Sequence, residues 1–171
     1  MYNGSIVPGK LRRPYAGTME QHSEKPEAVR RQLRRSSLWL AVLFVLAILL
    51  FTLSPGGSKT SGASVINAIA DIYGTREQAS WLLHGALFGL LGVSLSLWFA
   101  SSSAGHRSPM RTLAMLVLVV WIFAAATEFA QGRIDGRDAS VVDWIADMVG
   151  VLAGLLLAPM LLRPLFRLLL R

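Results

Sequence analysis

Four ionisable side chains interrupt otherwise apolar stretches of this sequence: His84, Glu128, Asp143 and Asp147. An ionisable residue is costly inside a membrane-spanning segment and therefore marks a candidate functional site. Carboxylates beside a histidine can perform acid–base chemistry or hold a divalent cation. The same residue types also fit a site for a ligand or lipid head group, or a structural network that keeps helix ends in register.

The loop between Glu128 and Asp143 is polar and contains Gln131, Arg133 and Arg137. An unpaired carboxylate inside a membrane tends to take up a proton. We therefore expect Arg137 to pair with one or more of the three acids. The sequence has no cysteine, zincin motif, nucleophile elbow or phosphate-binding glycine loop. No metal or cofactor is assigned, and the residues alone do not choose between an enzyme and a binding protein.

Glycines at helical spacing accompany these ionisable residues. Asp143 and Asp147 are followed by two glycines at spacings of three and four, which puts all four residues on one helix face. A second glycine pair, also spaced by four, begins directly after His84. Small residues let helices approach closely in a membrane. We therefore predict a helix-packing role for Gly85, Gly89, Gly150 and Gly154.

The elements that must position these residues are apolar helices. The chain has 171 residues, of which 53% are hydrophobic and 16% charged, whereas about 25% are charged in a typical soluble domain. A spanning helix needs about 20 mainly apolar residues. The pattern predicts an all-α integral membrane protein with four transmembrane helices in a bundle, because a soluble bundle would show polar helix faces. The predicted spans are 37–54, 81–101, 112–130 and 141–162, within a transmembrane domain of residues 36–162.

Basic residues orient the predicted spans. Residues 1–36, the loop after the second span and the C-terminal tail are all rich in Lys and Arg. Four spans place these three segments on one side, which the positive-inside rule identifies as the cytoplasm. Both termini are then cytoplasmic, and the four ionisable residues lie just under the outer surface. The net charge of +7 is thus explained by topology, and we expect no nucleic-acid binding because the basic segments lack interleaved aromatic residues.

Three segments outside the spans carry further predictions. Residues 1–35 are expected to be a disordered basic cytoplasmic N-terminus, and residues 163–171 a basic amphipathic tail on the inner leaflet. Both should contact anionic lipid head groups. Ser64–Tyr73 has the apolar spacing of a short amphipathic helix, with Ser64 as its cap and Gly74 as its end. This helix should lie flat on the outer surface or fold over the bundle.

The run from Glu128 to Gly154 resembles the VanZ-like family. The family pattern is Glu-x-x-Gln, then Arg, Asp and Asn at fixed spacings, then two glycines, and an earlier His is followed by Tyr. The corresponding residues here are His84, Phe88, Glu128, Gln131, Arg137, Asp143, Asp147, Gly150 and Gly154, with Phe88 in place of the family's Tyr and Asp147 in place of its Asn. The resemblance implies a small polytopic protein of the bacterial cytoplasmic (inner) membrane. It also implies a link to glycopeptide susceptibility, since the founding member is associated with resistance to a teicoplanin-type antibiotic.

The sequence therefore predicts a VanZ-like membrane protein of the cell envelope that binds or acts on lipid-linked or cell-wall material at the outer leaflet. A membrane-embedded enzyme acting on a lipid or glycan is one alternative, and a structural or assembly subunit of a membrane complex is another. A proton- or cation-coupled carrier is disfavoured because the inner halves of the spans carry almost no polar residues. Expected partners are membrane lipids and a lipid-linked ligand.

Overall fold

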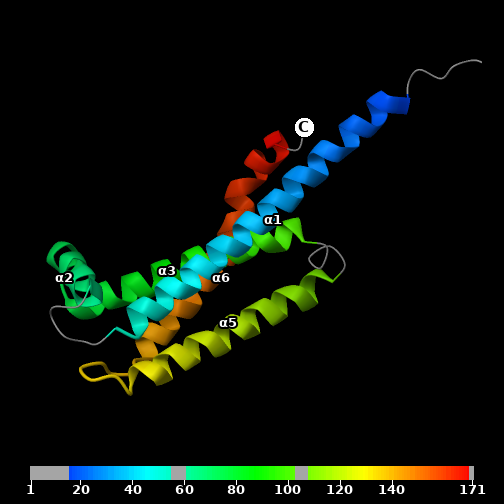
Figure 1. Ribbon diagram of the computed structural model, residues 1–171. Helices are drawn as coiled ribbons and strands as arrows, with labels where there is room; N and C mark the ends of the chain where they lie inside the picture. Colours follow the sequence, from blue (N-terminus) through cyan, green and yellow to red (C-terminus); the bar gives the residue numbers. More distant parts are fainter. Residues whose placement is uncertain (1–15, 55–60, 103–107, 170–171) are drawn as a thin grey trace, which may run out of the picture.

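The computed structural model describes residues 16–54, 61–102 and 108–169, and these form five helices without any strand (Figure 1). Four helices are long and apolar enough to cross a membrane, and one is short. The predicted all-α membrane fold with four spans and a short additional helix is therefore confirmed. In chain order the helices are α1 (Ala16–Thr52), α2 (Ser61–Tyr73), α3 (Arg76–Ser101), α5 (Pro109–Gln131) and α6 (Val141–Leu169).

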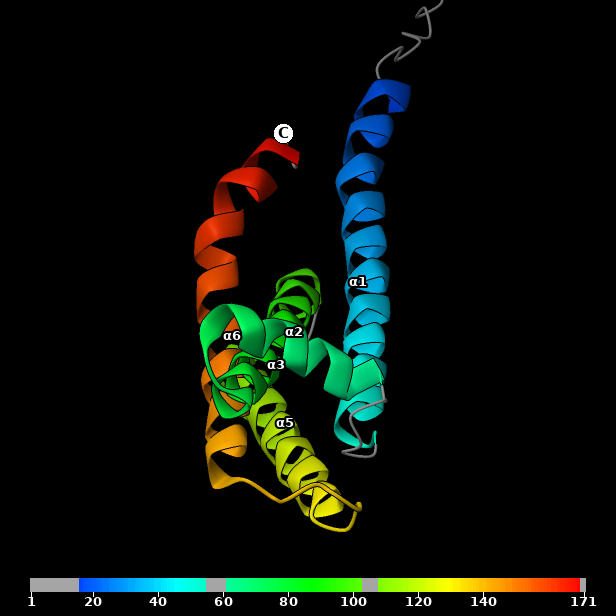
Figure 2. The same cartoon turned by 90° about the vertical axis from the view of Figure 1, so that its left-hand side faces the viewer.

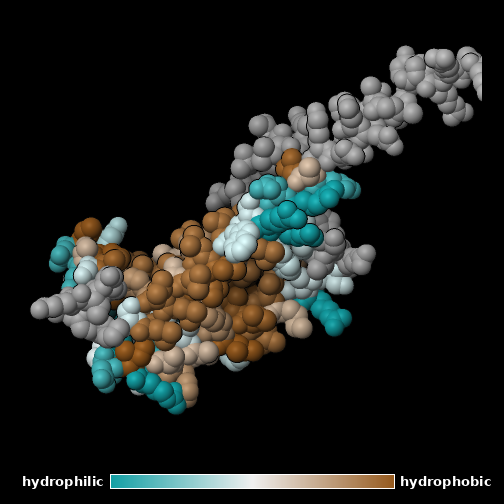
Figure 3. All heavy atoms as spheres, in the orientation of Figure 1, coloured by the Kyte–Doolittle hydropathy of each residue, from teal (hydrophilic) through white to brown (hydrophobic). Residues whose placement is uncertain are grey.

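The middle of the molecule presents apolar side chains outward, as a lipid-facing surface requires. Figure 3 shows a broad hydrophobic region over the helices, with hydrophilic residues gathered toward its two ends. Leu50 and Trp39 on α1 and Leu156 on α6 are among the exposed large apolar residues. The segments that could span a membrane are Glu27–Thr52, Arg76–Ser101, Pro109–Gln131 and Val141–Met160.

Helix α1 begins much earlier than predicted. Residues 16–35 were expected to be disordered, but they continue the apolar helix toward the N-terminus; residues 1–15 lie outside the described part. Extension of an existing helix needs no new nucleus, so the apolar segment favours helix in its polar neighbour. An exposed ion pair between Arg31 and Glu27, at 3.4 Å, adds slight support. At the other terminus, α6 includes the predicted tail up to Leu169, whose side chains lie outside the described residues.

The core lies where α3 packs against α6. Their interface is the most extensive in the molecule, α1 lies along α3, and α5 packs mainly against α6. Buried side chains from all four long helices meet there, including Ile48, Phe88, Val120 and Val151. The ends of α1 and α5 and the starts of α3 and α6 come together at one end of the bundle, which we call the α2 end (Figure 1).

Helix α2 folds over this end of the bundle. It lies across the ends of α3 and α1 in Figure 2, and its Ile66 and Ala70 pack with Ala79 of α3. It begins at Ser61, one turn before the predicted cap Ser64. Its predicted end is correct. Gly74 has φ of 121°, a left-handed conformation that glycine adopts readily, and its N–H bonds to the carbonyl oxygen of Ala70 at 2.8 Å.

Candidate functional site

The backbones of α3 and α6 touch at glycines. A Cβ atom added to Gly150 would collide with the carbonyl oxygen of Gly85, and one added to Gly154 would collide with that of Gly89. The four glycines with a predicted packing role therefore meet in one interface. Gly92 belongs to the same interface, since its added Cβ would lie 2.6 Å from the Val151 carbonyl oxygen. Its position three residues after Gly89 could have indicated this role.

This close approach brings together three ionisable side chains from three helices. His84 Nδ1 lies 2.9 Å from Asp147 Oδ1 and 3.9 Å from Glu128 Oε1. The side chains are almost fully enclosed, with exposed fractions of 3% for His84, 0% for Asp147 and 9% for Glu128. We call these three residues the buried trio. Such an arrangement can share protons, bind a cation or hold three helices in register.

Two neighbours hold Glu128 in place. The backbone N–H of Ser140 donates to Glu128 Oε2 at 2.9 Å. Gln131 is buried, and with its amide nitrogen turned toward the carboxylate it lies 3.1 Å from Glu128 Oε1. Gln131 ends α5, and Ser140 ends the connection between α5 and α6. The end of α5 and the connection that follows it therefore fix the carboxylate that α5 contributes.

Asp143 lies at the start of α6, one turn before Asp147. Its backbone N–H donates to Ser140 Oγ at 3.2 Å, as in a helix cap. In a capping box the acid at this position would bond back to the N–H of the cap residue. Glu128 already accepts from that N–H, so the Asp143 carboxylate is available to accept a bond from Ser80 Oγ at 3.3 Å.

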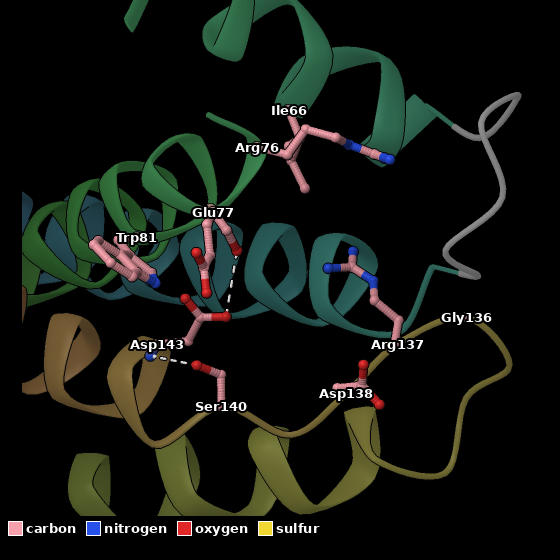
Figure 4. A pocket seen from close by; sticks show the side chains of 10 residues that line it. Ile66, Arg76, Glu77, Trp81, Gly136, Arg137, Asp138, Ser140 and Asp143 are labelled. Carbon is pink, nitrogen blue, oxygen red and sulfur yellow. Dashed lines mark hydrogen bonds between the residues drawn. The ribbon is translucent and has the colours of Figure 1, made fainter. Parts of the chain in front are cut away.

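Asp143 also lines a cavity of about 370 Å³ at the α2 end. Its walls come from α2, α3, the connection 132–140 and the start of α6 (Figure 4). The cavity contains both signs of charge, with two arginines and three acids. It is lined by Ile66, Arg76, Glu77, Ser80, Trp81, Gly136, Arg137, Asp138, Ser140 and Asp143, and we call it the α2-end cavity.

The predicted ion pair of Arg137 is wrong. No ion pair within 4.0 Å joins Arg137 to Glu128, Asp143 or Asp147 in the described structure. Its Nη2 instead donates to the carbonyl oxygen of Phe51 at 2.9 Å, and its Nε to that of Ser54 at 3.4 Å. The last carbonyls of a helix have no partner in the helix and carry partial negative charge. The Arg137 guanidinium therefore bonds to carbonyl oxygens at and just after the end of α1, and not to a carboxylate as the sequence predicted.

The other loop arginine makes no direct ion pair with the acids either. Arg133 Nη1 donates to the carbonyl oxygen of Phe129 at 3.2 Å, and its guanidinium lies 3.6 Å from the centre of the Phe129 ring. Burial lowers the pKa of Arg137, whereas the nearby charges of Asp143 and Glu128 raise it. An arginine remains protonated at neutral pH despite such shifts, so Arg137 brings a fixed positive charge to the cavity.

Several cavity residues were missed by the sequence analysis. Ser80 precedes His84 by four residues, a helical spacing that could have placed it on the same face. Ser140 and Asp143 form the Ser-x-x-Asp pattern of a helix start, which could have indicated the cap. No sequence signal was available for Arg76, because its place in the cavity depends on how α2 folds back.

Four apolar helices with a polar site at one end define a multi-pass membrane protein. A family model described as VanZ/LLP1 matches residues 38–163. Because that match spans most of the sequence, the chain belongs to the VanZ/LLP1 family, and the resemblance seen in the sequence is confirmed. No curated protein and no solved structure matches the chain.

Proposed function

We propose that this VanZ-family membrane protein binds the polar head group of a lipid-linked envelope molecule in the α2-end cavity, and thereby affects glycopeptide susceptibility. The observation that carries the proposal is a cavity with two arginines and three acids at one end of an apolar bundle. Its volume of about 370 Å³ lies within the range of small-molecule sites. A head group would enter this cavity while its apolar chain stays beside the helices.

The charges define the chemistry of the ligand. Arginine binds phosphate or carboxylate oxygens through parallel hydrogen bonds, so Arg76 and Arg137 suit the anionic part. The bonds from Arg137 to the carbonyl oxygens of Phe51 and Ser54 use two of its five N–H donors, which leaves three for a ligand. Glu77 and Asp143 face the cavity near Trp81 (Figure 4) and suit hydroxyl or ammonium donors.

We also propose that the α2 end faces away from the cytoplasm in a bacterial inner membrane, with both termini cytoplasmic. The support is the excess of Lys and Arg in the segments at the opposite end. Among them, Arg30, Arg31, Arg34 and Arg35 are exposed on α1 beside the apolar segment. At that place they would contact anionic lipid head groups of the inner leaflet.

Reporter fusions test this orientation. Fusions after Lys59 and after Asp135 should be translocated, whereas a fusion after Gly105 should remain cytoplasmic. Enzymatic reporters active on only one side of the membrane measure the outcome. Translocation of the reporter at Gly105 would show that the chain does not cross the membrane as proposed.

Head-group binding can be followed through Trp81, which lines the cavity. The probe is a polyprenyl diphosphate bearing an amino sugar, added to the full chain in detergent. It should change the tryptophan fluorescence, and this change should disappear in Trp81→Phe. Arg76→Ala should weaken binding about tenfold or more, as expected for loss of a charge-assisted hydrogen bond. In cells the same variant should reduce any effect on teicoplanin susceptibility.

Two controls decide the outcome. Arg133→Ala removes an arginine that contacts Phe129 of α5 and does not line the cavity, so it should leave probe binding unchanged. The polyprenol without diphosphate should bind at least tenfold more weakly than the full probe. Equal binding to wild type, Arg76→Ala and Glu77→Gln would show that the α2-end cavity is not the site. Conversion of the probe to a product would place the protein among enzymes.

A further inference from the structure

We propose that the buried trio binds one divalent cation that accepts mixed nitrogen and oxygen ligands, with Zn²⁺ and Mn²⁺ as the ions to test. His84 supplies a ring nitrogen, and Glu128 and Asp147 supply carboxylate oxygens. Mixed imidazole and carboxylate sites bind such ions in proteins. This site lies below the α2-end cavity, and the proposal does not depend on head-group binding.

The separations between the ligating atoms of the trio are close to those around a bound metal ion. One ligating atom from each member of the trio lies within 4.8 Å of the other two. His84 Nδ1 is 2.9 Å from Asp147 Oδ1 and 3.9 Å from Glu128 Oε1. A tetrahedral zinc ion with bonds of about 2.1 Å separates its ligands by about 3.4 Å. The two measured separations each differ from this value by about half an ångström, which side-chain rotation can supply.

An oxygen without a partner provides an independent reason for an ion. Asp147 is fully buried, and its Oδ2 has no hydrogen-bond partner in the described structure. A buried acceptor without a partner costs about 1–3 kcal/mol, and more when it is charged. A cation held beside this carboxyl group can engage both of its oxygens. The hydrogen bond between His84 and Asp147 would then be replaced by two bonds to the ion.

Charge balance supports the same conclusion. Two carboxylates with a neutral imidazole carry a charge of about −2 when ionised, and such a group is costly inside a membrane. The nearest arginines bond elsewhere, Arg137 to the end of α1 and Arg133 to Phe129. A divalent ion would neutralise the pair of carboxylates without another protein cation.

The surroundings also resemble the outer shell of a metal site. Ligating carboxylates in such sites accept hydrogen bonds that orient them, and Glu128 accepts from the Ser140 N–H and, with the Gln131 amide nitrogen turned toward it, from Gln131 as well. Asp143 lies one turn before Asp147 on α6 and lines the α2-end cavity. Its carboxylate also has one buried oxygen without a hydrogen-bond partner in the described structure, so it adds a second acidic group beside the trio.

The test uses the full chain in detergent, stripped with a chelator and titrated with ZnCl₂ or MnCl₂ alone. We expect about one ion per chain by elemental analysis and a raised unfolding temperature. Co²⁺ as a spectroscopic probe should give visible absorbance bands of a low-coordinate site. His84→Gln, Glu128→Gln and Asp147→Asn should each weaken binding at least tenfold. The matched controls are the other two histidines, as His22→Gln and His106→Gln, and the exposed Asp135→Asn, which should bind like wild type.

Wild-type protein settles the outcome even if a variant fails to fold. Less than one tenth of an ion per chain for both metals would overturn the proposal and leave the trio a hydrogen-bonded network. Binding that is lost in His22→Gln or His106→Gln, or kept in all three trio variants, would also overturn it by placing the ion elsewhere. Probe binding in the α2-end cavity is measured with chelator present, so failure of one proposal is distinguishable from failure of the other.

Discussion

Replacing Gly150 with leucine should destabilise the protein by about 3 kcal/mol or more, at the upper end of the cost of overpacking. Even alanine should lower the unfolding temperature clearly. A Cβ atom at residue 150 would collide with the carbonyl oxygen of Gly85 and lie 2.9 Å from its carbonyl carbon. These atoms belong to a helix backbone and cannot rotate away, so α3 would have to move as a whole. Gly154 meets the Gly89 carbonyl oxygen in the same way, and thermal unfolding in detergent measures both.

The partner glycines on α3 provide a matched control. A Cβ atom at Gly85 or Gly89 would lie 3.5 Å from the nearest backbone oxygen of α6, an ordinary contact. Gly85→Ala and Gly89→Ala should therefore change the unfolding temperature far less than Gly150→Ala and Gly154→Ala. Equal damage from Gly89→Ala and Gly150→Ala would contradict the relative position of α3 and α6 described above.

The spans could be predicted because their signal is local. Each needs only a long apolar run, and the four runs in the sequence became four helices. The end of α2 was also predictable, since Gly74 favours the required left-handed conformation. The start of α1 was not, because polar residues 16–35 have no apolar period of their own. Their helix depends on the apolar segment that follows them.

The buried trio could be predicted in outline from topology. One ionisable group near the same end of each of three spans must lie at one level, and His84, Glu128 and Asp147 do. Arg137 was also expected near that level, but its partner was wrong. Its partners are not side chains but two backbone carbonyl oxygens, of Phe51 in the last turn of α1 and of Ser54 just after it. Their position depends on how α1 packs along α3, which no spacing in the sequence reveals.

Arg137→Ala should lower the free energy of unfolding by about 2–3 kcal/mol. It removes two hydrogen bonds from a charged donor, and one such bond contributes about 1.5–3 kcal/mol; the longer bond, at 3.4 Å, contributes less. These bonds attach the connection between α5 and α6 to the end of α1, so the α2-end cavity should loosen as well. Arg137→Lys keeps the charge but not the fork of donors, and it should restore about half of the loss. Chemical unfolding in detergent measures each variant.

Arg133→Ala is the matched control and should change stability by no more than about 0.5 kcal/mol, because Arg133 is exposed. A double-mutant cycle then identifies the partner of Arg137. If Arg137 neutralised a carboxylate, removal of that charge as well, in Arg137→Ala with Asp143→Asn, would recover stability. Because the hydrogen-bond partners are the carbonyl oxygens of Phe51 and Ser54, and Asp143 acts on Arg137 only through space, we expect a recovery well below about 1 kcal/mol. If the double variant regained more than about 1 kcal/mol of unfolding free energy, Arg137 would after all be paired with the Asp143 carboxylate.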